Sequence, residues 1–202
     1  MKHSPNTQML QGVYREICTQ FDMSGSILEI GCGPSEYTVL NMDILKDAKF
    51  KVGINLQHYT HYEHFHVIEC NSNDMHDLFD DNTFDVIFSI CVLEHDKYFW
   101  KSLEEIRRVI KPGGLFLLAV PALANNMNMC KYVIDEHKEQ IKNMDILNST
   151  LTYCVHNAPG DYWRFTEQAY KEILLEGFID IEYSLFLMPP IIVGYGTRVC
   201  CQ

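Results

Sequence analysis

The sequence predicts an α/β fold in which helices flank an open, largely parallel sheet. Two observations predict it. Apolar runs of strand length recur along the chain with helical or turn-rich segments between them, and the first run leads directly into a glycine turn. A length of 202 residues suits one domain with a substantial core. We therefore expect a single domain over residues 1–202.

Seven apolar runs are predicted as strands. Their side chains are apolar on both faces, which is typical of strands in a parallel sheet covered by helices on both sides. The runs are residues 26–31, 50–55, 66–71, 84–90, 115–121, 178–188 and 197–201.

Helices are predicted from apolar spacing and from residues that begin or end helices. Pro34 suits the first turn of a helix, residues 111–114 (KPGG) end one, and Thr166 and Gly177 suit a start and an end. The predicted helices span the first twenty residues, the segment after the glycine turn, the segment from Phe99 to Ile110, and residues 166–177.

The alternation of predicted strands and helices does not continue through residues 121–165. The segment is polar and irregular, and it is long for a connection within a compact domain. Such segments are often lids or binding loops. We expect a substrate cap of about forty residues inserted after the fifth strand.

Composition excludes several classes of partner. The net charge of −11 argues against nucleic acid or an anionic membrane as a main partner. The longest apolar runs are too short to span a bilayer. The eight cysteines form no CxxC pair, most of them lie in apolar runs, and the N-terminus shows no signal-peptide pattern. These features predict a reduced, cytoplasmic protein.

The glycine turn "LEIGCGPS" predicts a ligand site at the end of the first strand. Gly31 and Gly33 allow a sharp turn and a close approach of the backbone to a ligand. A dinucleotide fingerprint would have a third glycine where this chain has Glu36, and an acid where it has Asn55. The acid instead precedes the glycines, as Glu29, which suits a ligand that carries an ammonium group. A nicotinamide-dependent oxidoreductase is therefore disfavoured.

Four segments in order resemble the class I S-adenosylmethionine-dependent methyltransferases, and in particular small bacterial enzymes of the type 11-like group. The segments are "ILEIGCGPS", "NDMHDL", "FDVIFSICVLEHD" and "LEEIRRVIKPGGLFLLAVP", which together cover roughly residues 26–121. The resemblance implies a Rossmann-like seven-stranded sheet flanked by helices, with S-adenosylmethionine as the cofactor.

The same resemblance implies a set of cofactor contacts. Glu29 would orient the turn, the glycine turn would line the methionyl group, Asp74 and Met75 would hold the adenine, and the carbonyls of Ser89 and Ile90 would accept from the ammonium group. Cys32 and Met75 also suit a simple packing role. The full set is Glu29, Gly31, Cys32, Gly33, Asn55, Leu56, Asp74, Met75, Ser89 and Ile90.

Asn55 departs from the family pattern. The family usually has Asp or Glu at this position, where the carboxylate accepts from both ribose hydroxyls. An amide can still accept one hydrogen bond and donate another. We expect the cofactor to bind, with an affinity that Asn55 could lower.

Two groups of residues in the sequence are of metal-ligating types. The run "HYTHYEHFH" holds four histidines within residues 58–66, but their spacing puts no three clearly on one face, so we predict that it forms the rim of the pocket. Some methyltransferases that this chain resembles use a Glu at the position of Cys91 as a ligand beside a pair like Glu94 and His95. Without that acid the oxygen-rich set is incomplete, so no required metal is predicted.

Methyl transfer from a sulfonium depends mainly on positioning, and a base is needed only where the acceptor must lose a proton. Residues 155–166 and the end of the fourth strand carry the candidate groups. We assign His95, His156 and Tyr162 to catalysis, and Asp161, Trp163 and Arg164 to substrate binding. The alternative is that Trp163 packs the cap onto the sheet while Asp161 and Arg164 pair with each other.

We therefore predict a methyltransferase acting on a small molecule. Oxygen is the favoured acceptor atom and nitrogen the open alternative. Relatives that share the segment at 155–166 suggest a sugar, surface-glycan or secondary-metabolite precursor. The alternative function is a catalytically silent protein of the same fold that binds the cofactor or serves as a partner subunit. The sequence does not predict an oligomeric state.

Overall fold

A computed structural model describes residues 5–33, 38–57, 64–123, 160–187 and 190–200. They form a seven-stranded sheet with the strand order β3-β2-β1-β4-β5-β7-β6. β7 runs antiparallel to both β5 and β6, and the other neighbours are parallel. The strands are β1 (Ser26–Ile30), β2 (Phe50–Asn55), β3 (His66–Glu69), β4 (Phe84–Ile90), β5 (Ile110–Pro121), β6 (Phe178–Leu187) and β7 (Pro190–Arg198). The predicted seven-stranded α/β fold is confirmed.

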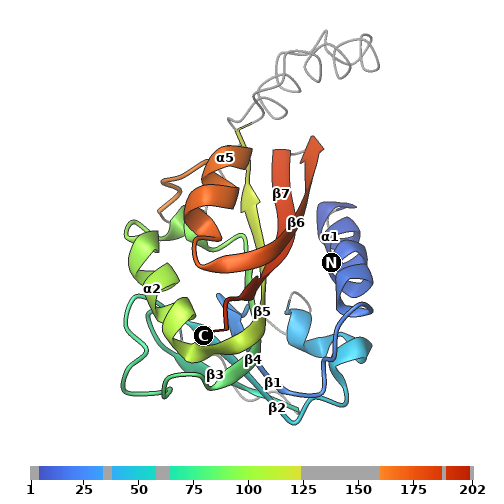
Figure 1. The fold of residues 1–202 in the computed structure, drawn as a ribbon, viewed down its shortest axis with the longest axis vertical. Helices are drawn as coiled ribbons and strands as arrows, with labels where there is room; N and C mark the ends of the chain where they lie inside the picture. The colour runs from blue at the N-terminus through green and yellow to red at the C-terminus, as the bar shows by residue number, and fades with distance from the viewer. Residues whose placement is uncertain (1–4, 34–37, 58–63, 124–159, 188–189, 201–202) are drawn as a thin grey trace, which may run out of the picture.

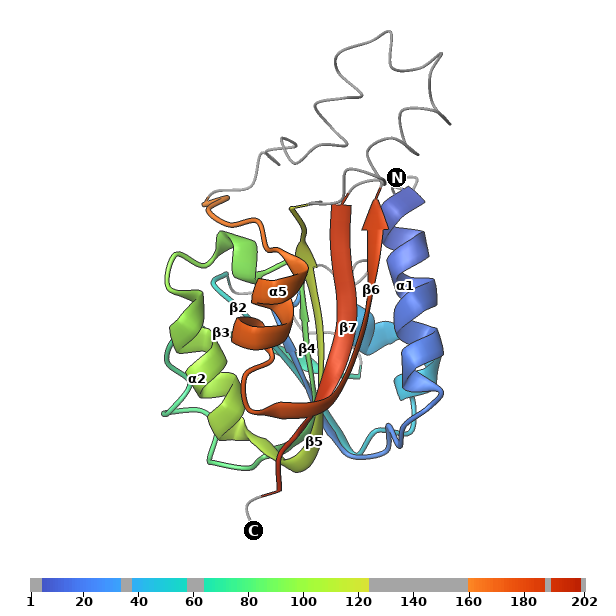
Figure 2. The same ribbon diagram turned by 45° about the horizontal axis from the view of Figure 1, so that its top comes forward.

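Helices cover both faces of this sheet, so the molecule has three layers (Figure 1, Figure 2). One face carries α1 (Pro5–Cys18), and the other carries α2 (Phe99–Val109) and α5 (Glu167–Ala169), which continues into η4 (Tyr170–Leu174). Consecutive β1 residues face opposite cores, Ile27 toward α1 and Leu28 toward α2. This two-sided burial explains why the strands read as continuous apolar runs.

The helix predicted directly after the glycine turn is not formed by the described residues there. They form two short 3-10 turns, η1 (Val39–Asn41) and η2 (Asp43–Leu45). The Thr38 hydroxyl accepts from the backbone N–H of Leu40, and the N–H of Val39 donates to the Glu29 carboxylate. The Glu29 carboxylate and the Thr38 hydroxyl thus cap the start of η1.

The last strand was predicted at residues 197–201, but β7 spans Pro190–Arg198. The run "IIVGYG" was not predicted as a strand. Its glycines allow β7 to pair closely with β6, since a Cβ on Gly194 would lie 2.2 Å from the Glu182 carbonyl oxygen. The KPGG segment likewise belongs to β5 instead of forming only a connection.

The predicted cap falls mostly outside the described residues. Its two ends meet at the sheet, where Ala122 forms a parallel bridge with Phe165. The Phe165 N–H donates to the Pro121 carbonyl, and the Leu123 N–H donates to the Phe165 carbonyl. The chain therefore leaves β5 and returns beside the end of that strand, and the cap itself stays a prediction.

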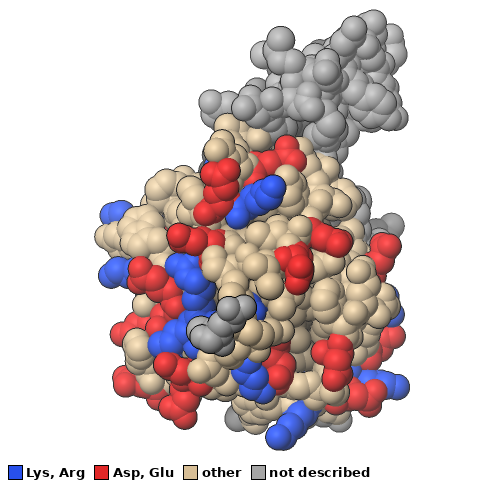
Figure 3. All heavy atoms as spheres, in the orientation of Figure 1, with Lys and Arg blue, Asp and Glu red and all other residues tan. Residues whose placement is uncertain are grey.

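No helix in the described part of the chain has both the length and the apolar character needed to cross a bilayer. On the face drawn in Figure 3, acidic and basic side chains are interspersed. The predicted lack of a nucleic-acid partner stays a prediction.

Candidate active site

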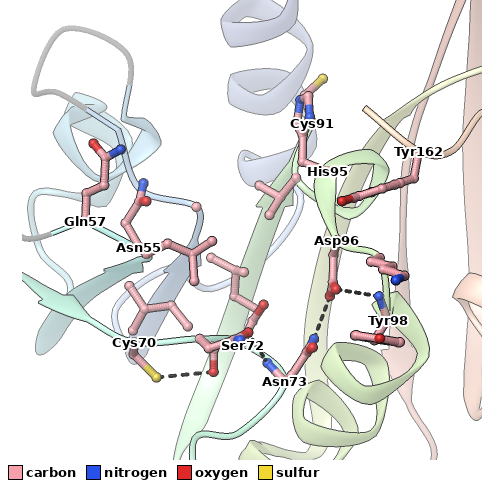
Figure 4. Close-up of a pocket in the computed structure, with 17 residues that line it drawn as sticks. Asn55, Gln57, Cys70, Ser72, Asn73, Cys91, His95, Asp96, Tyr98 and Tyr162 are labelled. Carbon is pink, nitrogen blue, oxygen red and sulfur yellow. Dashed lines mark hydrogen bonds between the residues drawn. The ribbon is translucent and has the colours of Figure 1, made fainter. Parts of the chain in front are cut away.

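A cavity of about 530 Å³ opens at the C-terminal ends of β1, β2 and β4 (Figure 4). This is the edge where open parallel sheets bind ligands, and the volume lies within the range of about 300–1,000 Å³ usual for small-molecule sites. The wall consists of Ile30, Gly31, Ile54, Asn55, Leu56, Gln57, Cys70, Asn71, Ser72, Asn73, Cys91, Val92, His95, Asp96, Lys97, Tyr98 and Tyr162.

The glycine turn is fastened to the end of β2. The N–H groups of Gly31 and Cys32 both donate to the Ile54 carbonyl, over 2.9 and 3.0 Å. Asn55 Nδ2 donates to the Cys32 carbonyl over 2.8 Å. Gly31 has a φ of +75°, and a Cβ there would lie 2.3 Å from Val92 Cγ2. Gly31 therefore meets a backbone and a packing requirement at once.

Of the other predicted residues at this turn, Leu56 lines the cavity, whereas Glu29, Cys32 and Gly33 do not. Glu29 is buried, accepts a hydrogen bond from the Thr38 hydroxyl, and has its pKa raised to about 7 by burial. It holds the chain beyond the turn instead of facing the cavity. Burial also raises the pKa of the Cys32 thiol well above its usual range, which excludes a nucleophile.

Asp74 and Met75 were predicted to hold the adenine, but neither lines the cavity. The Asp74 side chain is exposed, and Met75 is fully buried in the core. The Met75 N–H donates to Glu105 Oε2 over 2.7 Å, so it is not free for a ligand. Glu105 is held in turn by Arg108, which lowers the pKa of its carboxyl.

The residues immediately before this pair line the cavity instead. They are Cys70, Asn71, Ser72 and Asn73, which the sequence analysis missed. Asn73 Nδ2 donates to Asp96 Oδ2 over 2.7 Å, which joins this wall to the one beyond β4 (Figure 4). The sequence signal that could have identified this part of the wall is the short run of Asn and Ser directly after a predicted strand, which is typical of a turn.

Ser89 and Ile90 also lie outside the cavity wall, which Cys91 and Val92 form at the end of β4. Cys91 has a φ of +54°, uncommon for a residue other than glycine, and its N–H donates to the Ala119 carbonyl. The chain turns sharply here into the 3-10 turn η3 (Leu93–His95).

Two of the three predicted catalytic residues come together at the cavity. His95 and Tyr162 both line it, and the Tyr162 N–H donates to the Glu94 carbonyl over 2.7 Å. His95 Nε2 lies 3.7 Å from Oε1 of the buried Glu94, whose pKa burial raises to about 8. The third residue, His156, lies outside the described residues.

The three residues predicted to bind substrate have the structural roles given above as the alternative, in which Asp161 pairs with Arg164 and Trp163 packs. Asp161 and Arg164 form an ion pair with each other. Trp163 Nε1 donates to the Asp96 carbonyl over 2.9 Å, and its ring packs against Phe99. None of the three lines the cavity.

The histidine-rich run is only partly described. His58 and His61 lie outside the described residues, and His64 and His66 are exposed and do not line the cavity. Within the described ranges, no group of three or more His, Cys, Asp or Glu side chains could hold a metal ion. The predicted metal independence stays a prediction.

The donors and walls of this cavity suit S-adenosylmethionine. Ile54, Leu56 and Val92 supply apolar surface for a planar ring and a thioether chain. The Asn55 side-chain nitrogen donates a hydrogen bond to the Cys32 carbonyl, so the amide oxygen is the atom that Asn55 offers as an acceptor. A mixed wall of this kind fits a ligand with an aromatic base, a ribose and a charged amino-acid end.

Comparisons with known proteins point to the same class. Residues 28–118 match the family described as "Methyltransferase domain". A curated relative from Mycobacterium ulcerans, named "Probable phthiotriol/phenolphthiotriol dimycocerosates methyltransferase 2", is 30% identical over 122 residues, which cover 53% of this chain and 44% of the relative. An uncharacterized protein of Methanocaldococcus jannaschii is 34% identical over 96 residues, covering 46% of this chain and 40% of that protein. The chain thus spans less than half the length of these relatives.

Solved structures agree in fold over nearly the whole chain. A S-adenosylmethionine-dependent methyltransferase from Archaeoglobus fulgidus superposes with a TM-score of 0.64 at 12% identity, covering 95% of this chain and 94% of that one. A methyltransferase from Haloferax volcanii, solved with the Trm112 methyltransferase activator, gives 0.60 at 15% identity and covers 96% and 94%. In fold, and in sequence over residues 28–118, the chain is similar to the class I S-adenosylmethionine-dependent methyltransferases.

Proposed function

We propose that this protein transfers the methyl group of S-adenosylmethionine to a small-molecule acceptor, on an oxygen atom. One observation carries the proposal. A single cavity is bordered by the glycine turn at Gly31 on one side and by the titratable His95 and the phenol Tyr162 on the other. Bound cofactor supplies an electrophilic methyl group, and the protein contributes mainly by positioning.

The cofactor is held by the ends of β1 and β2 in this proposal. Gly31 borders the methionyl group, the Asn55 amide oxygen accepts from a ribose hydroxyl, and Leu56 packs on the adenine. The segment from Cys70 to Asn73 takes the adenine-facing role first assigned to Asp74 and Met75. The support for this change is the cavity wall itself and the engagement of the Met75 N–H by Glu105.

The acceptor is oriented by His95 and Tyr162. A neutral imidazole at the cavity wall can take the proton that an acceptor hydroxyl loses. The Tyr162 hydroxyl can donate a hydrogen bond to the acceptor and so fix its angle of approach. His156 keeps its proposed catalytic role.

The acceptor class follows from the resemblance of the segment at 155–166, and is a sugar, surface-glycan or secondary-metabolite precursor. Nitrogen remains the competing acceptor atom, because a structural neighbour is a Haemonchus contortus phosphoethanolamine N-methyltransferase at 14% identity. A panel of hydroxyl- and amine-bearing small molecules, followed by detection of S-adenosylhomocysteine and mass analysis of the product, decides between them.

The binding part is tested by calorimetry with S-adenosylmethionine and S-adenosylhomocysteine. The variant Gly31→Ala should abolish binding, because a Cβ there meets Val92 and the positive φ disfavours a side chain. Gly12→Ala is the matched control, since nothing lies within 4 Å of its added Cβ. Binding of NAD without binding of S-adenosylmethionine would refute the proposal.

A second candidate is a catalytically silent protein that binds the cofactor or a partner subunit. The support is the Haloferax volcanii methyltransferase solved with an activator protein, together with Asn55 at a position where the family usually has an acid. Cofactor binding without turnover on any acceptor, alone or after co-purification with a partner, would favour this reading.

We also propose that the protein works in the cytoplasm, without a nucleic-acid or membrane partner. The support is the net charge of −11 and the presence of free thiols, which a reducing compartment preserves. Cys18, Cys32, Cys70, Cys91 and Cys200 are all free cysteines.

A further inference from the structure

A positively charged side chain, Lys97, forms part of the cavity wall. Among the described residues, Lys97 is the only Lys or Arg that lines the cavity, and Asp96 is the only Asp or Glu. In the part of the chain that the structure describes, neither Lys97 nor Lys101 forms an ion pair with an acidic side chain. The chain as a whole has a net charge of −11. A cation at the cavity without an acidic partner is therefore a candidate for binding an anion.

The ammonium groups of Lys97 and Lys101 both lie close to the ring of Tyr98. Lys97 Nζ is 5.4 Å from the ring centroid, and Lys101 Nζ is 5.6 Å from it. Contacts of this length are attractive because the face of an aromatic ring is electron-rich. Tyr98 itself lines the cavity and is 45% exposed. The ring thus keeps two positive charges beside the cavity, and each ammonium group retains N–H donors for a ligand.

Asp96 fixes the segment that carries Lys97. Its Oδ2 accepts from Asn73 Nδ2 over 2.7 Å and from the Ser102 hydroxyl over 2.6 Å. Its Oδ1 accepts from the Tyr98 N–H over 2.8 Å. Three donors therefore share the one carboxylate of the cavity wall, which weakens the repulsion that it exerts on an anionic ligand. The same bonds hold the backbone on both sides of Lys97 before a ligand binds, which lowers the entropy cost of binding.

This charged segment lies on the acceptor side of the cavity. Figure 4 shows Asp96, Tyr98 and Tyr162 on one side, and Asn55 and Gln57 on the other. The side that carries Asn55 is the one assigned above to the cofactor, and Tyr162 is assigned to the acceptor. Tyr162 also lines the cavity and is 53% exposed, so its ring and that of Tyr98 offer surface on which an acceptor can pack.

We propose that Lys97 binds an anionic group of the methyl acceptor, a carboxylate or a phosphate, and that Lys101 adds a second positive charge beside it. This inference rests on the proposed function and narrows its acceptor from small molecules in general to anionic ones. The body of the acceptor packs on Tyr98 and Tyr162. The two lysines also attract the acceptor before contact, and this attraction weakens as the salt concentration rises.

The test titrates three matched probes into the protein and follows its amide NMR signals. Phenol, 4-hydroxybenzoate and 4-hydroxyphenyl phosphate share a phenolic hydroxyl and differ in the anionic group. Each probe is added to the protein alone and to the protein saturated with S-adenosylhomocysteine. At least one anionic probe should bind about 3- to 10-fold more tightly than phenol, an effect between that of an exposed ion pair and that of a charge-assisted hydrogen bond. The tighter of the two anionic probes identifies the anion as carboxylate or phosphate.

Lys97→Gln should remove this preference, and Lys101→Gln should reduce it. Lys46→Gln is the matched control, because it removes the same charge from an exposed residue that does not line the cavity. Absence of binding, equal affinity of the wild type for all three probes, or equal losses in Lys97→Gln and Lys46→Gln would overturn the inference. Displacement of the anionic probes by S-adenosylhomocysteine would also overturn it, since the anion would then occupy the cofactor's part of the cavity. Failure of the wild type to bind S-adenosylhomocysteine would instead overturn the proposed function.

Discussion

Asn55 Nδ2 donates a hydrogen bond to the Cys32 carbonyl over 2.8 Å, and so ties the end of β2 to the glycine turn. The two residues are 23 positions apart in the chain. An amide can make this bond because it has a donor, whereas a carboxylate has none. The residue that departs from the family pattern is thus part of the framework of the site.

The variant Asn55→Asp should therefore weaken cofactor binding, although it restores the acid usual in the family. It leaves the Cys32 carbonyl facing a negative charge, and the loss of a part-buried hydrogen bond of this kind costs about 1–3 kcal/mol, or about 5- to 150-fold in affinity. Calorimetry with S-adenosylhomocysteine measures the change. Gln20→Glu adds the same charge on the exposed surface away from the cavity and should have no effect. Tighter binding by Asn55→Asp would contradict this prediction.

His95→Ala should lower turnover by about 10²–10⁴-fold once an acceptor is known, the range expected for loss of a general base. Cofactor affinity should change little, because His95 is assigned to the acceptor. Initial rates of S-adenosylhomocysteine formation check the first point, and calorimetry checks the second. The control is His76→Ala, since His76 is exposed, contacts Glu105 and does not line the cavity. Wild-type rates for His95→Ala would mean that positioning alone suffices.

The stability of the wild type should fall as pH rises from about 4.5 to about 8. The pKa of Glu94 is raised to about 8 from a model-peptide value of 4.5, mainly by burial, so the folded state holds a proton that the unfolded state has lost. Deprotonation in the folded state then costs stability. Glu94→Gln should gain stability relative to the wild type above about pH 8, by at most about 5 kcal/mol.

Melting temperatures of both proteins between about pH 5 and pH 9 measure this difference. Some slope should remain in Glu94→Gln, because burial also raises the pKa of Glu29 to about 7. Parallel curves for the two proteins would show that Glu94 does not titrate as described.

Activity should survive removal of divalent metal ions. Among the described residues, no group of three or more His, Cys, Asp or Glu side chains could hold a metal ion, and Glu94 and His95 have Cys91 nearby where a third acid would be needed. Turnover in a chelating buffer should equal turnover in untreated buffer. Loss of activity with the chelator and rescue by added magnesium or zinc would contradict this expectation.

The sequence by itself determined the α/β class, six of the seven strands, the helices α1 and α2 and the helical segment of α5 and η4, together with the resemblance to methyltransferases. β1, β2 and β4 were predictable because strands covered on both faces need apolar side chains at every position, which leaves continuous runs. Gly31 was predictable as a site residue because a turn with positive φ favours glycine. His95 and Tyr162 were predicted at the cavity and do line it.

Only the tertiary structure decided which polar groups are available to a ligand. Met75 matched the family pattern, yet its N–H is taken by Glu105, thirty residues further on. Asp161 and Arg164 matched a binding role but pair with each other. A polar side chain or N–H bonds to whichever partner the fold brings near, and those partners come from distant parts of the chain. Local sequence therefore predicts the location of a site better than it predicts which donors and acceptors of that site are available to a ligand.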